Sequence, residues 1–295
     1  MPVALNCNLC TSTNYKVLPQ KSNLLDLDGL KKLLNIESEL YCVRCVNCGL
    51  VYLNPMPTSE ELKQYYEEDY DFILHRNSQH YLKGSESIKR ELFEYEKYVK
   101  KGRLLDVGCG TGNYVFRAQE LGWESYEIEI SRIYSDFLRN ELGLNVMNVS
   151  IEEVNFSSNY FDVVVLNHVL EHLFDPKNML KKIYGFLKKG GILAIYIPNE
   201  LESLYSTLML DNLLFYFQPG ERPTDHLYFF NKKTIQLLLR TTGFKIIELT
   251  TGNFRINTDH KNRYGLIGDL GKKFYCSLAD LLKMGDLFNI IAIKK

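Results

Sequence analysis

The chain has 295 residues, of which 45% are hydrophobic, a composition ordinary for a globular protein with a substantial core. It carries 35 Lys and Arg residues against 36 Asp and Glu residues, and this balance argues against a nucleic-acid partner. No apolar run reaches the roughly 18 residues of a membrane span, and the first residues lack a signal-peptide pattern. The sequence therefore predicts a cytoplasmic protein without a transmembrane segment.

Two C-x2-C pairs stand near the start of the chain. They are Cys7 with Cys10, and Cys45 with Cys48. Such pairs can aim four thiolates at one tetrahedral zinc ion, and a reducing compartment disfavours disulfides. Cys42 with Cys45 is an alternative second pair, although the glycine after Cys48 favours the pair above. Because four thiolates leave no open position for catalysis, we expect a structural, zinc-ribbon-like module over residues 1–58. Buried cysteines without a metal are the alternative.

Residues 59–98 are rich in charge and in Tyr, and they predict a helical connector. The candidate N-caps of its first helix are Thr58 and Ser59, because acidic residues follow in the first turn. Tyr66 and Tyr70 are candidates to cover a ligand that is bound by the next domain.

The stretch LLDVGCGTG, residues 104–112, carries the main ligand signal. A short buried strand, a glycine turn and a helix follow one another there, and such a unit presents backbone N–H groups to a nucleotide-type ligand. Asp106, just before the turn, would repel a pyrophosphate but attract ammonium and sulfonium groups. The loop also lacks the G-x-G-x-x-G spacing of dinucleotide sites. These features favour S-adenosylmethionine over NAD.

A second strand, ESYEIEI, ends near Glu129, about 20 residues beyond the loop, where an acid can accept hydrogen bonds from ribose hydroxyls. Glu127 shares that strand face and is the second candidate. Strands continue to alternate with helices, and the expected N-caps of the later helices are Ser131, Asp175 and Asn231. This alternation predicts an α/β fold with a parallel, doubly wound sheet.

These motifs together resemble the class I S-adenosylmethionine-dependent methyltransferases. The matching stretches are LLDVGCGTG, the acid that ends the second strand, FDVVVLNHVLEHLFDP, LKKGGILAIYIPN and DHLYFFNKKTIQLLLRTTGF. The resemblance implies a Rossmann-like, seven-stranded sheet over residues 99–295, with its last strand antiparallel. Insertions are expected at about 200–226 and 253–286. The cofactor would lie above the carboxyl ends of the first strands.

Carried over by position, the resemblance also implies which residues contact the cofactor. Those expected at the methionine part are Asp106, Gly108, Cys109 and Gly110, and Glu129 is expected at the ribose. The family often has an acid near the adenine after the third strand, where this chain has Ser150. The adenine contact therefore falls to Ser150, to the Ile151 backbone or to a neighbour. Asn167 is expected to border the cofactor at the end of the fourth strand.

The stretch NHVLEH, residues 167–172, leaves three interpretations open. His168 follows the fourth strand, and a neutral His there can accept the proton of a hydroxyl acceptor. The second interpretation is metal ligation by His168, Glu171 and His172. These residues have the His-x-x-Glu-His spacing of some zinc hydrolases and would lie in a single helical turn. The third interpretation is that Glu171 and His172 only fix the neighbouring loop by hydrogen bonds.

His226, beside Asp225, is the other candidate base, and a surface turn is its alternative interpretation. The predicted function is methyl transfer from S-adenosylmethionine, with His168, His226 and Glu171 as candidate catalytic residues. The cysteine pairs ahead of this fold resemble sugar and glycan-pathway methyltransferases, which implies O-methylation of a sugar, glycan precursor or related small molecule. The alternatives are a zinc hydrolase and a non-catalytic module that binds zinc and cofactor. Oligomerisation is left open.

Overall fold

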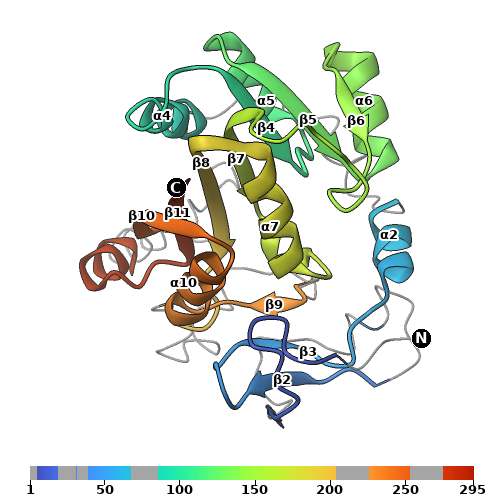
Figure 1. Cartoon of the computed structure of the whole chain (residues 1–295), viewed down its shortest axis with the longest axis vertical. Coiled ribbons are helices and arrows are strands. Elements are labelled where there is room, and N and C mark those ends of the chain that lie inside the picture. The colour runs from blue at the N-terminus through green and yellow to red at the C-terminus, as the bar shows by residue number, and fades with distance from the viewer. Residues whose placement is uncertain (1–4, 19–30, 32–38, 68–85, 204–225, 253–274) are drawn as a thin grey trace, which may run out of the picture.

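The computed structural model describes residues 5–18, 31, 39–67, 86–203, 226–252 and 275–295. Tyr70, Asp225 and most of both expected insertions lie outside the described residues. The described helices and strands build one large and one small sheet (Figure 1). Among the described helices, none has the length and apolar character needed to cross a membrane.

The large sheet has seven strands in the order β10-β11-β8-β7-β4-β5-β6. They are β4 (Arg103–Val107), β5 (Glu124–Glu129), β6 (Val146–Asn148), β7 (Phe161–Asn167), β8 (Leu187–Pro198), β10 (Phe244–Gly252) and β11 (Leu287–Lys294). The strands from β4 to β8 run parallel, whereas β11 pairs antiparallel with both β8 and β10. The predicted doubly wound sheet with an antiparallel last strand is confirmed.

Helices cover both faces of this sheet because successive side chains of a strand point to opposite faces. Leu104 of β4 belongs to the same buried cluster as residues of α4 and α5, whereas Leu105 belongs to the cluster that includes residues of α7 and α10. The helices are α4 (Glu86–Tyr95), α5 (Asn113–Glu120), α6 (Arg132–Leu142), α7 (Pro176–Phe186) and α10 (Lys232–Thr241). Both faces of the central strands are therefore buried, which accounts for their nearly continuous apolar runs.

The helix starts follow the expected capping residues. Ser131, Asp175 and Asn231 each accept a hydrogen bond from a backbone N–H in the first turn of their helix. Helix α2 (Ser59–Glu67) begins with a reciprocal cap, in which Thr58 Oγ1 accepts from the Glu61 N–H and Glu61 Oε2 accepts from the Thr58 N–H. Thr58 is thus the N-cap of this helix.

The small sheet has the strand order β1-β2-β3-β9. Three strands come from the first part of the chain, and the fourth comes from a distant segment. They are β1 (Tyr15–Val17), β2 (Cys42–Cys45), β3 (Val51–Leu53) and β9 (Tyr228–Phe229). In Figure 1, β9 lies between the other strands of the small sheet and the helices α7 and α10. The small sheet therefore includes a strand from the segment that follows His226.

The segment NHVLEH is not an α-helical turn. Asn167 is the last residue of β7, His168 has a φ of 55°, and only Leu170–His172 forms a short 3₁₀ turn, η2. The strand continues this far because Asn167 pairs with Tyr196 of β8 and the His168 N–H donates to the Tyr196 carbonyl oxygen. The expectation that His168 and His172 share one helix face is therefore wrong.

Candidate active site

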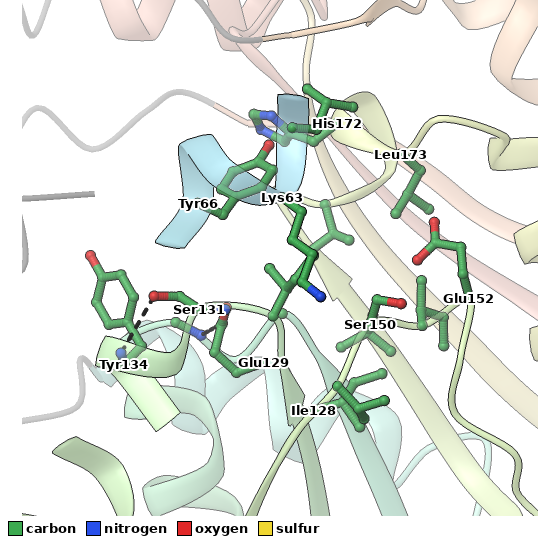
Figure 2. Close-up of a pocket in the computed structure, with 18 of the residues that line it drawn as sticks. Lys63, Tyr66, Ile128, Glu129, Ser131, Tyr134, Ser150, Glu152, His172 and Leu173 are labelled. Atoms are coloured by element: carbon green, nitrogen blue, oxygen red, sulfur yellow. Dashed lines mark hydrogen bonds between the residues drawn. The ribbon is translucent and has the colours of Figure 1, made fainter. Parts of the chain in front are cut away.

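A pocket of about 750 Å³ opens at the carboxyl ends of β4, β5 and β7 (Figure 2). This edge is the place where doubly wound sheets bind ligands. The predicted site residues in its lining are Gly108, Gly110, Glu129, Ser150, Ile151 and His168. Three other predicted residues, Asp106, Cys109 and Asn167, are not part of that lining. Cys109 packs instead with a small apolar cluster near α6.

The glycine loop between β4 and α5 has backbone angles that favour glycine, and at Gly108 it leaves no room for a side chain. Gly108 has a φ of 66°, and a Cβ there would lie 2.9 Å from Val169 Cγ2. Gly110 has a φ of 47°, and its N–H donates to Glu129 Oε2 over 2.8 Å. Since both backbone angles favour glycine, the chain can pass close to a ligand at this point.

Glu129 is fixed by backbone donors on both sides. Besides the bond to Gly110, its Oε1 accepts from the Ser131 N–H over 2.8 Å, and the side chain is only 6% exposed. An ionised carboxylate can accept about four hydrogen bonds in all. The acid at the end of β5 is therefore held rigidly in the pocket wall.

Three buried carboxylates, Asp106, Glu127 and Glu129, lie close together beneath the loop. Burial raises the pKa of Asp106 well above its usual value, and the nearby charges of Glu127 and Glu129 raise it further. Burial also raises the pKa of Glu127 to about 7. A positively charged ligand, with ammonium and sulfonium groups, would favour ionisation of these carboxyl groups, whereas a pyrophosphate would raise their pKa values further.

We expect Glu127→Gln to change how stability depends on pH. The folded protein keeps a proton on Glu127 up to a pH of about 7, whereas the unfolded chain releases it near 4.5. The stabilisation that this proton gives to the folded protein is fully present below pH 4.5 and is lost as the pH rises through about 7. The full difference is about 3 kcal/mol.

Urea unfolding of the two proteins at pH 4.5 and pH 8 measures this difference. At pH 8 the free energy of unfolding of Glu127→Gln should exceed that of the native protein, and at pH 4.5 the two values should be similar. Glu120→Gln, at an exposed carboxylate, is the control. Parallel pH curves for Glu127→Gln and the native protein would contradict the prediction.

Glu171 is the centre of a histidine cluster next to the pocket. Its carboxylate is 1% exposed, with Oε1 lying 3.4 Å from His168 Nδ1 and 3.9 Å from His172 Nε2. The ring of His226 packs edge-on against His172, with centroids 4.8 Å apart. Burial alone would raise the pKa of Glu171, but the three histidines lower it below its usual value. The carboxylate is therefore kept ionised.

His168 and His172 line the pocket, whereas His226 lies behind His172 and is not in the lining. His226 Nδ1 is 2.9 Å from Glu200 Oε1, a partner that the sequence does not suggest because 26 residues separate the two. The Leu227 N–H donates to the Glu171 carbonyl oxygen over 2.9 Å. The fold thus brings His226 next to the NHVLEH segment. Neither sequence motif indicates this proximity.

The donor atoms of Glu171, His172 and His226 all lie within 4.8 Å of one another. Such a group could hold a metal ion, but it differs from the set that the zinc-hydrolase spacing requires. His168 is not a member of the group, because the segment departs from an α-helical turn. The His-x-x-Glu-His spacing therefore does not describe the geometry at this position.

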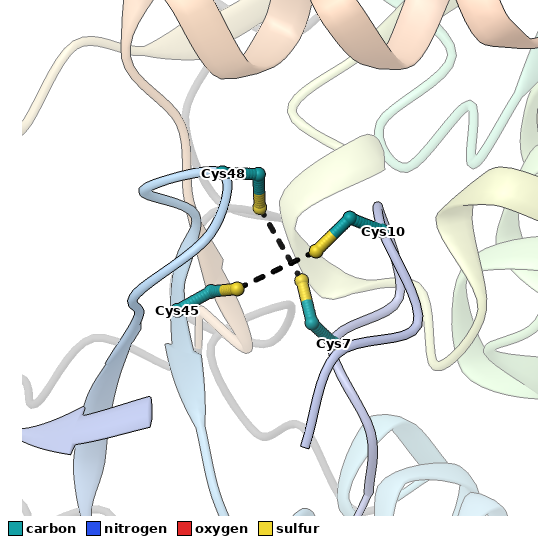
Figure 3. Close-up of side chains that lie close together, drawn as sticks. All are labelled: Cys7, Cys10, Cys45 and Cys48. Carbon is teal, nitrogen blue, oxygen red and sulfur yellow. Dashed lines mark hydrogen bonds between the residues drawn. The ribbon is translucent and has the colours of Figure 1, made fainter. Parts of the chain in front are cut away.

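The four cysteines of the expected zinc module converge (Figure 3). The Sγ atoms of Cys7 and Cys48 lie 3.5 Å apart, as do those of Cys10 and Cys45, and all four lie within 4.8 Å of one another. Zinc–sulfur bonds of about 2.3 Å in a tetrahedron require sulfur atoms about 3.8 Å apart. Cys42 is buried in β2 and lies outside this group. The preferred pairing, not the alternative one, matches a tetrahedral thiolate site.

Helix α2 also contributes to the pocket. Lys63 and Tyr66 line it, and the Tyr66 ring meets His172 edge-on with centroids 6.3 Å apart (Figure 2). The sequence suggested Tyr66 as a cover but gave no sign of Lys63. Tyr134 of α6 and Phe174 before α7 are further lining residues that no motif marked.

Comparison with known proteins agrees with this site. Residues 74–249 match a family model described as a methyltransferase domain. A ubiquinone biosynthesis O-methyltransferase from Rickettsia typhi is 24% identical over 237 residues, which span 77% of this chain and 91% of that protein.

Solved structures agree as well. A SAM-dependent methyltransferase from Archaeoglobus fulgidus is 25% identical and has a TM-score of 0.52, with 77% of this chain and 100% of that chain covered. A Thermotoga maritima structure titled a SAM-dependent methyltransferase, possible histamine N-methyltransferase, shares the fold at 21% identity and a TM-score of 0.51, covering 79% and 100% of the chains. The chain belongs to the methyltransferase-domain family and is an S-adenosylmethionine-dependent methyltransferase.

Proposed function

We propose that this enzyme O-methylates a hydroxyl group of a small molecule. The observation that carries this proposal is the histidine cluster around Glu171, which adjoins the cofactor pocket. Transfer of a methyl group to a hydroxyl releases a proton, and a histidine stabilised by a buried carboxylate is suited to accept it. An acceptor without a proton to lose would have no use for this arrangement.

In the proposed binding mode, the glycine loop and Glu129 hold the cofactor. The Gly108 and Gly110 backbone approaches the methionine part, and Glu129 accepts hydrogen bonds from the ribose hydroxyls. Ser150 and the Ile151 backbone face the adenine. Asp106 contributes only indirectly from beneath the loop, since its side chain does not line the pocket. Cys109 and Asn167 keep only backbone or indirect roles.

In the proposed reaction, the bound cofactor would supply a methyl group on a positively charged sulfur. The acceptor oxygen bonds to the methyl carbon as the carbon–sulfur bond breaks, with the two bonds in line. His168 accepts the hydroxyl proton on Nε2, the ring nitrogen that does not face Glu171. Glu171, next to Nδ1 of His168, stabilises the imidazolium that forms. His226 supports His172 from behind and is itself oriented by Glu200.

The acceptor class is a narrower proposal. The cysteine module ahead of the fold favours a sugar or glycan precursor, whereas the Rickettsia relative is named for ubiquinone biosynthesis. Both acceptor types present a hydroxyl, and this common chemistry is what the histidine cluster serves. We also propose that Cys7, Cys10, Cys45 and Cys48 bind a structural zinc ion, because their spacing fits a closed tetrahedral site.

We expect His168→Asn to lower the rate of methyl transfer by about 100-fold at pH 7, the usual contribution of a general base. The measurement is transfer of labelled methyl groups to panels of nucleotide-linked sugars, simple glycosides, catechols and phenols. Binding of S-adenosylmethionine, followed by calorimetry, should be retained within about threefold because His168 lies beyond its proposed contacts.

The pH profile separates a base from a purely structural residue. The native rate should level off with rising pH, whereas the His168→Asn rate should keep rising as hydroxide replaces the base. Equal profiles for the two proteins would exclude His168 as the proton acceptor. Tight cofactor binding without transfer to any panel member would favour a non-catalytic binding protein.

A further inference from the structure

The described residues of the four-cysteine module share their buried core with the large sheet. Cys7, Leu40 and Tyr52 belong to the same buried cluster as Leu166 of β7 and Leu170 beside Glu171. Since one continuous core joins the module to the large sheet, the module is packed against the site and is not attached only by a linker. Its connections to the histidine cluster can be followed through individual contacts.

The first connection runs through β9, immediately after His226. Strand β9 pairs antiparallel with β3, with Tyr228 opposite Tyr52 and stacked on it. The Leu53 N–H donates to the Leu227 carbonyl oxygen over 3.0 Å, and the Leu227 N–H donates to the Glu171 carbonyl oxygen over 2.9 Å. Leu227 is thus bonded to the module on one side and to the segment around Glu171 on the other.

The second connection comes from the first cysteine pair. Asn8, between Cys7 and Cys10, donates to Asp175 Oδ1 over 2.7 Å and accepts from the Lys177 N–H over 3.1 Å. The Lys177 Nζ donates to the Leu9 carbonyl oxygen over 2.8 Å. The cysteine loop therefore supplies a second cap to α7, the helix that directly follows the NHVLEH segment and its loop.

The third connection is α2, which begins shortly after β3. Its Tyr66 meets His172 edge-on and lines the pocket. The segment around Asn8 thus contacts the start of α7, whereas β3 pairs with the strand that follows His226, and α2 of the connector contacts His172. The two halves of the module are the segment around Cys7 and Cys10 and the segment around Cys45 and Cys48. If only one of them contacted the large domain, the position of the histidine cluster would not depend on how the two halves are joined.

We propose that the four-cysteine module is a positioning element of the active site, in which the metal that joins its halves sets the order of His226, Glu171 and His172. This inference rests on the proposed zinc site. Loss of the metal would leave the two halves joined by the pairing of β1 with β2 and would release the loop of Cys7 and Cys10, which is 35 residues or more from its cysteine partners along the chain. The histidine cluster would then lose its order while the cofactor-binding strands remain folded.

Amide hydrogen exchange of the full chain tests this proposal. Zinc is measured in the purified protein and then removed with a chelator, and exchange is followed with and without the metal. We expect exchange over residues 226–230 and 170–174 to rise by at least about tenfold, because local opening raises exchange within one cooperative unit. Residues 103–107 and 124–129, in β4 and β5, should keep their protection.

A variant that retains zinc makes the test independent of metal removal. Asn8→Ala removes both hydrogen bonds to α7, and exchange over residues 171–177 should rise by about tenfold. Turnover of an identified acceptor should fall by a similar factor, while KM for S-adenosylmethionine changes less than about threefold. Asn6→Ala, at an exposed position two residues away, is the matched control and should leave all values unchanged.

The outcomes separate the zinc site from its role. Protein purified without zinc, with the cysteines reduced, would contradict the proposed metal site, and Asn8→Ala would still test the contacts. Zinc-containing protein that loses zinc without any change over residues 226–230 would overturn the positioning role. A uniform rise in exchange after zinc removal, together with unchanged exchange in Asn8→Ala, would also overturn it, because the module would then act only on global stability.

Discussion

Glu129→Gln is expected to weaken binding of S-adenosylmethionine by about 100-fold, because each hydrogen bond to a charged group contributes about 1.5–3 kcal/mol. The two carboxylate oxygens already hold the Gly110 and Ser131 N–H groups. An amide offers one acceptor and one donor, so its NH₂ group must face one of these N–H donors. The substitution is therefore expected to weaken the proposed ribose contact and to loosen the glycine loop.

Calorimetric titration with S-adenosylmethionine and with S-adenosylhomocysteine measures this loss. Glu152→Gln is the matched control, because Glu152 lines the same pocket but is exposed at its edge (Figure 2). Its affinity should stay within about twofold of the native value, as for most exposed substitutions. If Glu129→Gln binds like the native protein, Glu127 becomes the next candidate for the ribose, and the proposed cofactor orientation is wrong.

Glu171→Gln is expected to lower kcat by up to about 100-fold while affinity for S-adenosylmethionine stays within about threefold. The carboxylate is buried and ionised among His168, His172 and His226, and an amide of the same shape cannot stabilise the imidazolium. Replacing the acid that orients a catalytic histidine lowers kcat by about 10⁴-fold in a well-studied case. We expect a smaller effect because the contact to His168 is longer, at 3.4 Å.

Steady-state kinetics with an identified acceptor checks this effect, and Glu120→Gln, which carries the same change on the surface, is the control. Native activity that requires an added divalent cation, and loses that requirement in Glu171→Gln, would point to metal ligation by Glu171, His172 and His226 instead. A kcat within about threefold of the native value would show that the carboxylate has neither role.

Local patterns were sufficient to predict most of the large sheet. The apolar run before Gly108, the capping residues Ser131 and Asp175 and the glycine turn each act within a few residues of the chain. Their structural consequences are therefore visible in the sequence. The position of Glu129 follows from the same locality, because the length of the strand–loop–helix unit fixes where β5 ends.

The histidine cluster could be predicted only in part, because its geometry depends on contacts between distant segments. Glu200 faces His226 across 26 residues, and no spacing rule links an acid to a histidine over that separation. The helical interpretation of NHVLEH failed for a related reason. Pairing with β8 extends β7 through Asn167, and this tertiary pairing overrides the local preference for a turn of helix.

The small sheet also bears on the order in which the protein folds. Tyr52 and Tyr228 are paired neighbours in it, yet 176 residues separate them along the chain (228 minus 52). During synthesis at about 5–20 residues per second, β3 must wait some ten seconds or more for its partner strand. The apolar edge of β3 is available to other chains during that interval, as unpaired strand edges are. The four-cysteine module is therefore made well before β9 but is completed only after β9 has been made.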